Sequence, residues 1–369
     1  MALRDNDHPS HHYRTIPKLP GQNGAELIRT SDILFIDLET THDGKRLLDA
    51  GAVLGTGEMR SGKLDGLGPM LARAKVVAGH NLLRHDLPLL KARLGQKALA
   101  GKSILDTLGW SALLFADKPY HKLVKGYQLH DADAESNPLS DAKLCKRLLE
   151  EMLGRFVKLD HGLKEVYWHL LHDKAGYGPL FGAAGYSATT ARILQAIDQR
   201  FSGLYCTEAD VERMAQERPV ELAHVLALIA TVDDASVLPP WVVHAMPVTQ
   251  ELLHELRFRS CGRPSCTYCA TRLDPHKALQ DLFGYTAFRH FDGDGEIGIQ
   301  EQAVNAALQG RSLLTVFPTG GGKSLTFQLP ALMQGQLTRS LTVVISPLVS
   351  LMKDQVDALR VNGIPAAFL

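Results

Sequence analysis

The sequence carries no excess of either charge: 40 lysine and arginine residues balance 40 aspartate and glutamate residues, so the net charge at pH 7 is zero. A protein that coats nucleic acid with its whole surface is strongly basic, and this balance argues against that class. Any contact with nucleic acid must therefore use local grooves. The hydrophobic content of 45% is ordinary for globular protein, and 369 residues suffice for two or three domains.

The sequence also lacks an uninterrupted apolar run of about 18 residues, and its start lacks the basic and apolar stretches of a secretion signal. We therefore predict a cytoplasmic protein without a membrane span. Cysteine is scarce, with five residues in the chain, and three of them lie close together between positions 261 and 269. This pattern fits a reducing compartment and metal binding better than a disulfide framework.

Residues 1–30 are polar and show no hydrophobic period, so we expect a flexible lead-in. Its histidines, His8, His11 and His12, are assigned no function. The first ordered element is expected at SDILFIDLETT, where ILFI predicts a central strand that carries Asp37 and Glu39 on one face. Two carboxylates side by side repel each other and are stabilised by cations such as Mg²⁺, although a solvated acidic strand end is the alternative.

The next segments predict a mixed α/β domain. Residues 46–64 predict a pair of antiparallel strands, and residues 76–95 predict a strand, a turn and a helix that carries Asp86. Residues 103–115 predict another strand that leads into a helix. Residues 137–153 predict an amphipathic helix with Asp141 in its first turn.

FIDLETT, HNLLRHD and NPLSDA resemble the three sequence motifs of the DEDD exonucleases, over roughly residues 31–155. The resemblance implies an RNase H-like fold and 3′–5′ exonuclease chemistry. It places the catalytic, metal-binding acids on four residues: Asp37, Glu39, Asp86 and Asp141. These acids would hold two Mg²⁺ ions, one generating a hydroxide and the other stabilising the leaving 3′ oxygen.

The third motif departs from the family, because Ser136 and Asn137 stand where a general-base His or Tyr is expected. His130 or His121 is the candidate replacement. Without a base, the metals alone would support slow hydrolysis, or the domain would hold single-stranded DNA as a non-catalytic clamp.

Residues 156–278 predict a mainly helical connector, with a loop at GYGPLFGAAGYS and with Tyr167 and Trp168 in the core. Cys261, Cys266 and Cys269 have the spacing C-x4-C-x2-C, which suits a metal site. Cys206 as fourth ligand gives Zn²⁺ or [4Fe–4S], whereas His254 or His276 favours zinc. Ordinary reduced thiols are the alternative, and Cys145 is expected to be a core residue.

Residues 279–369 contain FPTGGGKS, from Phe317 to Ser324, between a run that predicts a buried strand, SLLTVF, and a segment that predicts a helix. Glycines in a strand-to-helix turn let backbone N–H groups surround a phosphate, with the positive end of the helix beside it. This context predicts a P-loop that binds ATP, in which Lys323 contacts the β- and γ-phosphates and Ser324 binds Mg²⁺.

LFGYTAFR, residues 300–332 and VISPLVSLMKDQV resemble motifs 0, I and Ia of the RecQ-family DNA helicases, in that order. The resemblance implies an incomplete RecA-like domain. It implies adenine contacts by Tyr285, Phe288, Arg289 and Gln300, phosphate contacts by Thr319, Gly320, Gly321, Gly322, Lys323 and Ser324, and DNA contacts by Ser346, Lys353 and Gln355. The segment HFDGDGEIGI, between Arg289 and Gln300, departs from the family because it has about eight residues more than is usual there, and this departure bears on the geometry of the adenine pocket.

The sequence ends at Leu369, before the Asp-Glu box and the second RecA-like lobe that phosphoryl transfer needs. We therefore expect the front part of an ATP-driven 3′–5′ DNA helicase joined to an exonuclease-like domain. Its partner would be single-stranded or partly duplex DNA, in repair or recombination. The alternative is a fragment that binds ATP without turnover, with the nuclease-like domain serving as a DNA clamp.

Overall fold

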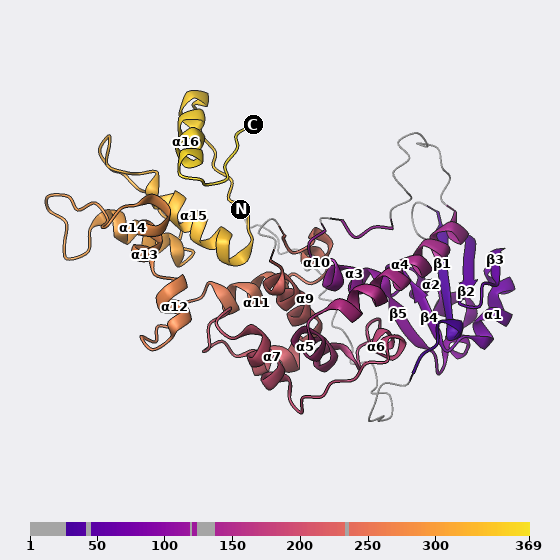
Figure 1. Ribbon diagram of the computed structural model, residues 1–369. Helices are drawn as coiled ribbons and strands as arrows, with labels where there is room; N and C mark the ends of the chain where they lie inside the picture. Colours follow the sequence, from indigo (N-terminus) through magenta and orange to yellow (C-terminus); the bar gives the residue numbers. More distant parts are fainter. Residues whose placement is uncertain (1–26, 42–45, 119, 124–136, 233–235) are drawn as a thin grey trace, which may run out of the picture.

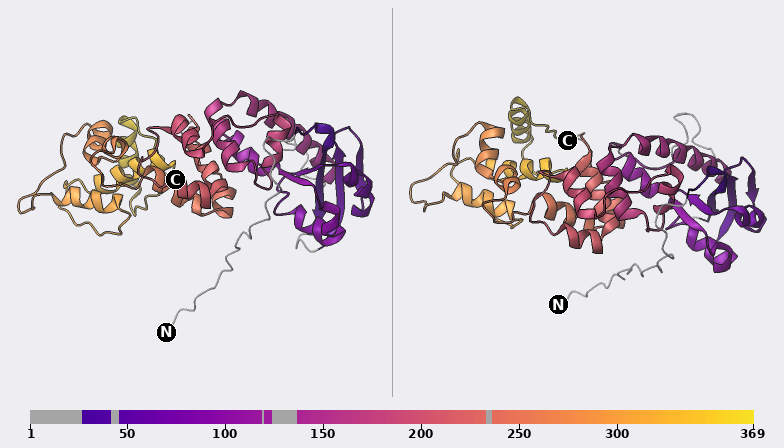
Figure 2. Two further views of the ribbon diagram at one scale, coloured as in Figure 1. Left: turned by 90° about the horizontal axis from the view of Figure 1, so that it is seen from below. Right: turned by 60° about the horizontal axis from the view of Figure 1, so that its bottom comes forward.

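The computed structural model describes residues 27–41, 46–118, 120–123, 137–232 and 236–369. The chain passes from a sheet at one end, through a helical middle, to a group of helices at the other end, and the three views agree on this elongated order (Figures 1 and 2). In the described part of the chain, no helix is long and apolar enough to cross a membrane.

The sheet has five strands in the order β3-β2-β1-β4-β5. β1, β2 and β3 pair antiparallel, while β4 runs parallel to β1 and β5 runs parallel to β4. These strands confirm the strand expected at ILFI and the antiparallel pair after it. Their bounds are Ile33–Thr40 for β1, Leu47–Leu54 for β2, Met59–Gly62 for β3, Val76–Gly79 for β4 and Ser103–Asp106 for β5.

Alternation along β1 separates two cores. Phe35 faces a core that includes the helices α3 (Thr107–Leu114) and α4 (Pro138–Lys158). Ile36 faces the opposite core, with α1 (Gly68–Arg73) and α2 (Asp86–Leu94). Short 3₁₀ turns complete this region: η1 (Thr30–Asp32), η2 (Leu64–Leu67) and η3 (Gln96–Leu99).

The helical middle shares its core with the α4 face of the sheet. Trp110 is fully buried there, and its ring meets those of Phe156, Tyr167 and Phe181 edge to face, with centroids 5.3 to 6.1 Å apart. α4 continues through the expected domain boundary at residue 155. The middle helices are α5 (His161–Leu171), α6 (Gly178–Ala184), α7 (Ile193–Phe201), α8 (Val211–Glu217), α9 (Pro219–Ala230), α10 (Pro240–Ala245) and α11 (Val248–Arg257).

The prediction of a loop at GYGPLFGAAGYS is wrong for the centre of this segment, which forms the helix α6. Pro179 occupies the first turn, where its missing N–H costs nothing, and Gly185 ends the helix with a left-handed φ of 62°. Leu180 and Phe181 are fully buried. Burial of this short apolar run outweighs the low helix propensity of its glycines.

The C-terminal helices form a separate core around Leu279, Val304 and Leu329. One of them, α13, spans the expected boundary at residues 278 and 279. The bounds are Thr267–Arg272 for α12, Pro275–Phe283 for α13, Ile299–Leu308 for α14, Leu325–Thr338 for α15 and Val349–Val361 for α16.

The buried strand predicted at SLLTVF is not formed. Residues 312–317 have no strand hydrogen bonding, and Leu314 and Val316 are 91% and 81% exposed. The apolar run 341–345 is likewise unpaired, with Ile345 94% exposed. A strand needs partners on a sheet, and two apolar runs alone make at best a marginal pair in water.

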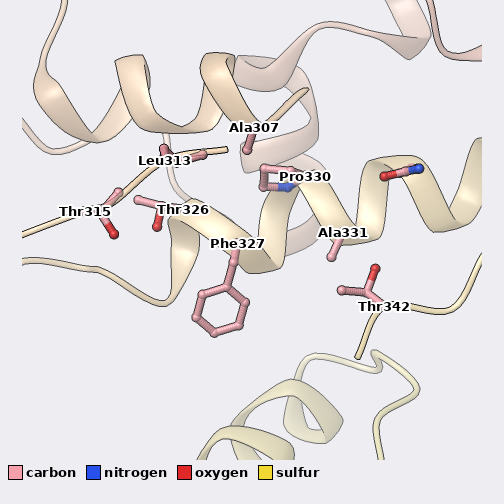
Figure 3. A pocket seen from close by; sticks show the side chains of 9 residues that line it. Ala307, Leu313, Thr315, Thr326, Phe327, Pro330, Ala331 and Thr342 are labelled. Atoms are coloured by element: carbon pink, nitrogen blue, oxygen red, sulfur yellow. The ribbon is translucent and has the colours of Figure 1, made fainter. Parts of the chain in front are cut away.

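A cavity of about 330 Å³ lies beside α15, between that helix and the two unpaired apolar runs (Figure 3). Leu313 and Thr315 line it from one run, Thr342 lines it from the other, and Phe327 and Pro330 line it from α15. The residues predicted to bind nucleotide do not line this cavity. The cavity therefore lies between α15 and the unpaired runs and is not the predicted nucleotide site.

Candidate functional site

The segment predicted to be a P-loop directly precedes α15, although the strand expected before it is not formed. Gly320 and Gly322 have positive φ angles of 77° and 75°, which side chains with a Cβ rarely adopt. The Lys323 ammonium donates to the carbonyl oxygens of Phe317 and Pro318, at 2.8 and 3.2 Å. The loop therefore bends back on itself ahead of the helix, as a phosphate-binding turn requires.

Gln300 connects the expected adenine residues to the P-loop. Its side chain is buried; Oε1 accepts from the backbone N–H of Arg289 at 2.8 Å, and Nε2 donates to the carbonyl of Gly322 at 3.1 Å. The Arg289 guanidinium donates to the carbonyl of Gly320. A Cβ on Gly322 would lie only 2.4 Å from Gln300 Nε2. Two predicted residues, Arg289 and Gln300, and the glycine loop thus form one connected unit.

The ten-residue insertion folds on itself between Arg289 and Gln300. Asp294 accepts from the backbone N–H groups of Phe291 and Ile299, at 2.9 and 3.2 Å. The ring of His290 meets the carbonyl of Gly295 at 2.9 Å. The insertion is therefore a closed loop, and it leaves the contact between Arg289 and Gln300 in place.

The remaining predicted nucleotide and DNA residues lie around this unit. Tyr285 is 57% exposed and stacks on Phe283, and Phe288 packs edge to face with His276. Gln355, on α16, reaches within 3.5 Å of the Ser324 hydroxyl. Two further residues are placed as follows: Ser346 hydrogen-bonds within its own turn, to Leu348, and Lys353 is exposed on α16.

The acids of the sheet domain meet where β1 approaches α4. Asp37 and Glu39 lie on the α4 face of β1, and Asp141 lies in the first turn of α4. One carboxylate oxygen of each lies within 4.8 Å of the others. The two-residue spacing on the strand and the packing of α4 across it explain this convergence.

Asp86 stands beside this group and is not a member of it. β1 extends past the last register pair with β4, Phe35 with Ala78, so the N–H of Leu38 has no partner on that strand. Asp86 Oδ1 accepts this N–H at 3.1 Å and also meets His85 Nδ1 at 3.2 Å. Asp86, the fourth predicted acid, therefore uses one carboxylate oxygen to hold the end of β1.

The electrostatics of the group are those of crowded carboxylates. Burial, together with the nearby negative charges of Asp86, Asp141 and Glu39, raises the pKa of Asp37 to about 7. The hydrogen bond to Asp86 raises the pKa of His85, which is half-exposed. Positive charge is therefore favoured at this point of the surface.

Asp106 is a site residue that the sequence interpretation missed. Its buried carboxylate accepts from the backbone N–H groups of Asn81, Leu83 and Leu108, at 2.9 to 3.0 Å. It thereby caps α3 and fixes the turn that leads to Asp86, in which Asn81 has a left-handed φ of 65°. An Asp between a strand and a helix is a typical N-cap signal and was available in the sequence.

The candidates for the missing general base are occupied or not described. Asn137 is the N-cap of α4, where its Oδ1 accepts from Leu139 and Ser140 at 3.0 and 3.2 Å. His121 is buried against the Ser111 hydroxyl at 2.9 Å. Ser136 and His130 lie outside the described residues.

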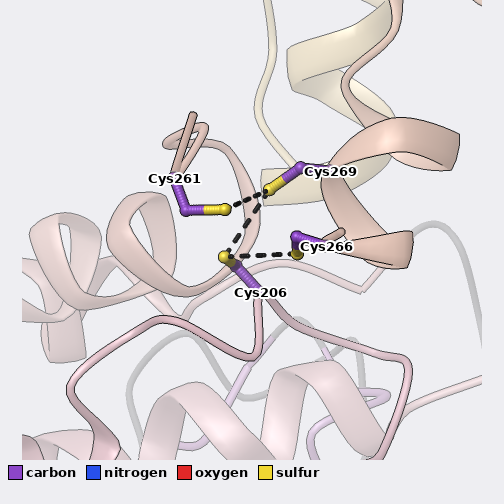
Figure 4. A group of neighbouring side chains, drawn as sticks. All are labelled: Cys206, Cys261, Cys266 and Cys269. Atoms are coloured by element: carbon purple, nitrogen blue, oxygen red, sulfur yellow. Dashed lines mark hydrogen bonds between the residues drawn. The ribbon is translucent and has the colours of Figure 1, made fainter. Parts of the chain in front are cut away.

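Four cysteines converge between the helical middle and the C-terminal helices (Figure 4). Their Sγ atoms are 3.9 Å apart for Cys206 and Cys266, 3.6 Å for Cys261 and Cys269, and 3.5 Å for Cys206 and Cys269. The backbone N–H of Cys269 lowers the pKa of Cys266 to about 6. Cys206 is thus the fourth member.

The remaining predicted thiol and histidines lie apart from this group. His276 pairs with Glu301 at 2.9 Å, and His254 packs on Phe258. Cys145 is buried in the sheet core, as expected. The histidine alternatives for the fourth ligand are therefore not supported by the geometry.

Comparison with known proteins finds similarity in the C-terminal part of the chain. The family of DEAD/DEAH box helicases matches residues 297–367. Proteins described as ATP-dependent DNA helicase RecQ are similar to it: that of Haemophilus influenzae is 52% identical over 91 residues, and that of Synechocystis is 45% identical over 100 residues. The C-terminal part of this chain is homologous to the RecQ helicases. No solved structure matches the chain.

The RecQ homology covers 25% to 27% of this chain and only 13% to 18% of those two relatives. The RecQ protein of Bacillus subtilis gives the same picture, at 45% identity over 92 residues and 14% of its length. The DEAD/DEAH box match at residues 297–367 contains the segment FPTGGGKS.

Proposed function

We propose that the RecQ-like segment is the nucleotide-binding front of an ATP-dependent DNA helicase that unwinds in the 3′–5′ direction. The observation that carries this proposal is the side chain of Gln300, which joins Arg289 to Gly322. In this arrangement, recognition of the adenine and binding of the phosphates are mechanically linked. The identity to RecQ helicases over this segment supports the same function.

The chain's own groups suit Mg·ATP. The positive φ angles of Gly320 and Gly322 turn the loop, and α15 presents the positive end of its dipole to the phosphates. Lys323 would exchange its two loop carbonyls for phosphate oxygens, which are stronger acceptors because they are charged. Ser324 would hold the Mg²⁺, with Gln355 beside it.

Single-stranded DNA would lie along the exposed side of α16, with Lys353 and Ser346 as its contacts. Lys353 is solvent-exposed there, and α16 buries little of its own surface. An exposed lysine contributes salt-dependent affinity for phosphates. Partly duplex DNA would present the same strand.

Calorimetric titration of Mg·ATP into the purified chain tests the nucleotide site. Lys323→Ala should abolish measurable binding, because it removes the only predicted phosphate-contacting ammonium. Lys277→Ala removes the same charge from exposed surface on α13 and serves as the matched control. Equal affinities for the two variants would refute the assignment of Lys323.

We propose further that the sheet domain binds divalent metal at Asp37, Glu39 and Asp141 and acts on the 3′ end of a DNA strand. The residues fit such a metal: three carboxylates lie within 4.8 Å of one another, and their mutual repulsion contributes to the raised pKa of Asp37. Bound Mg²⁺ would supply an activated water and neutralise the leaving oxygen. Asp86 would position β1 beside these acids.

A non-catalytic clamp is the second candidate for this domain. The observation that favours it is Asn137, which caps α4 at the position of the expected base. Such a domain would hold a single strand for the motor without cutting it.

Degradation of single-stranded DNA labelled at its 3′ end, with Mn²⁺, separates the two candidates. A nuclease without a base should be slow in the parent, inactive in Asp37→Asn, and faster in Ser136→His, by up to the roughly 10² to 10⁴ that a general base supplies. If the parent and Ser136→His are both inert while DNA binding persists, the clamp is the correct function.

For the four cysteines, we propose a metal site of Zn²⁺ or [4Fe–4S] type. This proposal is supported by the position of Cys206, whose thiol lies with the three clustered thiols and makes a group of four. Metal analysis of the purified chain tests it.

A further inference from the structure

The geometry points to a single structural zinc ion bound by Cys206, Cys261, Cys266 and Cys269, which fixes the RecQ-like segment to the helical middle. This inference rests on the proposed metal site and goes further, because it selects the metal and gives it a mechanical role.

The separations of the sulfurs select one ion. A zinc ion about 2.3 Å from each of four tetrahedral thiolates separates neighbouring sulfurs by about 3.8 Å. The distances between Sγ atoms here are 3.5, 3.6 and 3.9 Å, and all four sulfurs lie within 4.8 Å of one another. In a [4Fe–4S] cluster, each thiolate binds a different iron, so the sulfurs stand outside the cluster and much farther apart.

The backbone holds the four thiols in this arrangement. Cys206 follows α7, and its N–H donates to the carbonyl of Leu256, near the end of α11, at 2.8 Å. Tyr268 is buried next to the cysteines and donates its hydroxyl to the carbonyl of Arg257 at 2.8 Å. An ion pair of 2.6 Å between Arg263 and Glu208 spans the same two segments at the surface. Two stretches more than fifty residues apart in sequence are thus held together around the sulfurs.

The four-cysteine site also borders the core of the C-terminal helices. Leu273, which follows α12, packs against both the cysteine cluster and the core of the C-terminal helices. Phe258, which follows α11, is a buried member of that core, together with Leu279 of α13 and Leu329 of α15. Zinc would therefore fix α12, and through Leu273 it would fix the packing of α13 against the helix that follows the P-loop.

The test is a metal count on the purified chain of residues 1–369. We expect one zinc and no iron per chain, with the zinc released by a mercurial reagent. Substitution by Co²⁺ should give the intense visible bands of a tetrahedral four-thiolate site, which needs no variant. Chelation should increase tryptic cleavage between residues 257 and 277, because α12 and α13 lose their attachment.

Cys261→Ser is the variant of choice, because Cys261 is the least buried of the four. It should lower the zinc content to less than about a tenth. Cys145→Ala, at the fifth cysteine, lies in the sheet core and should keep the full zinc content. Iron with acid-labile sulfide would overturn the choice of zinc and leave the metal site standing. No metal, with Cys206, Cys261, Cys266 and Cys269 all reacting freely with a thiol reagent, would overturn the metal site itself, and neither result bears on the nucleotide site.

Discussion

Asp37→Asn should stabilise the protein at alkaline pH. Burial and the neighbouring acids raise the pKa of Asp37 from 3.8 to about 7, so the folded protein keeps this proton up to neutral pH while the unfolded chain releases it. The unfolded state therefore binds fewer protons between these values, and the stability of the parent falls as the pH rises through this window. An amide at position 37 carries no charge and removes this loss.

The magnitude follows from the shift. Each pH unit between the two pKa values costs about 1.4 kcal/mol, so the loss at pH 8 is at most about 4 kcal/mol. Movement of the acids and entry of water reduce this limit, and we expect a gain of about 2 kcal/mol for the variant at pH 8, falling towards zero at pH 4.

The assay is urea unfolding followed by tryptophan fluorescence, since Trp110 lies in the core shared by the sheet and the middle helices. Glu150→Gln, on the exposed side of α4, is the matched control and should change the stability little at any pH. Mn²⁺ should favour the parent, by about 2.7 kcal/mol at a hundredfold excess over its dissociation constant. A stability difference that is independent of pH and of Mn²⁺ would refute the reasoning.

Three further outcomes are expected. Glu165→Gln should lower the free energy of unfolding by about 3 kcal/mol at neutral pH. The reason is that hydrogen bonds from two threonines and a tyrosine lower the pKa of this buried carboxylate to about 2. The difference between parent and variant in urea unfolding should shrink as the pH falls from 4.5 towards 2. Gly322→Ala should weaken Mg·ATP binding at least about tenfold in calorimetry, because its Cβ would clash with Gln300, whereas Gly310→Ala, with a similar φ of 71° and open space, should not. Asp106→Ala should lower the free energy of unfolding by about 3 kcal/mol, because three backbone N–H groups lose their acceptor. It should also weaken Mn²⁺ binding, because the turn before α2 loosens. An unchanged affinity for Mn²⁺ would limit Asp106 to a structural role.

The sequence by itself determined the features that depend on local pattern. Alternation in ILFIDLET predicted β1 and placed Asp37 and Glu39 on one face, because side-chain direction along a strand depends only on neighbouring residues. The glycines of FPTGGGKS and the helix after them were also predicted, since positive φ angles and helix starts are local properties. The match to the DEAD/DEAH box helicase family, at residues 297–367, contains this segment.

Patterns that need distant partners failed or stayed open. SLLTVF has the composition of a strand, yet it is unpaired and exposed, because hydrogen bonds between strands come from other parts of a chain. The segment containing α6 looked like a loop until burial of Phe181 against Trp110 was known. The resemblance placed four acids in three separate motifs, but only the packing of α4 across β1 brought Asp141 to Asp37 and left Asp86 to hold Leu38.

Only the tertiary structure decided how the two candidate sites are assembled. Spacing named three cysteines and left Cys206 and two histidines as candidates for the fourth ligand, whereas the fold, in which the N–H of Cys206 bonds to Leu256 of α11, brings Cys206 to the other three. The resemblance to the RecQ helicases named Arg289 and Gln300, with ten residues between them, whereas their link to Gly322 is a contact of the folded chain, alongside an intervening loop that closes on itself. Such contacts join backbone segments whose mutual position is set by the buried cores, and no local property of the sequence encodes that position.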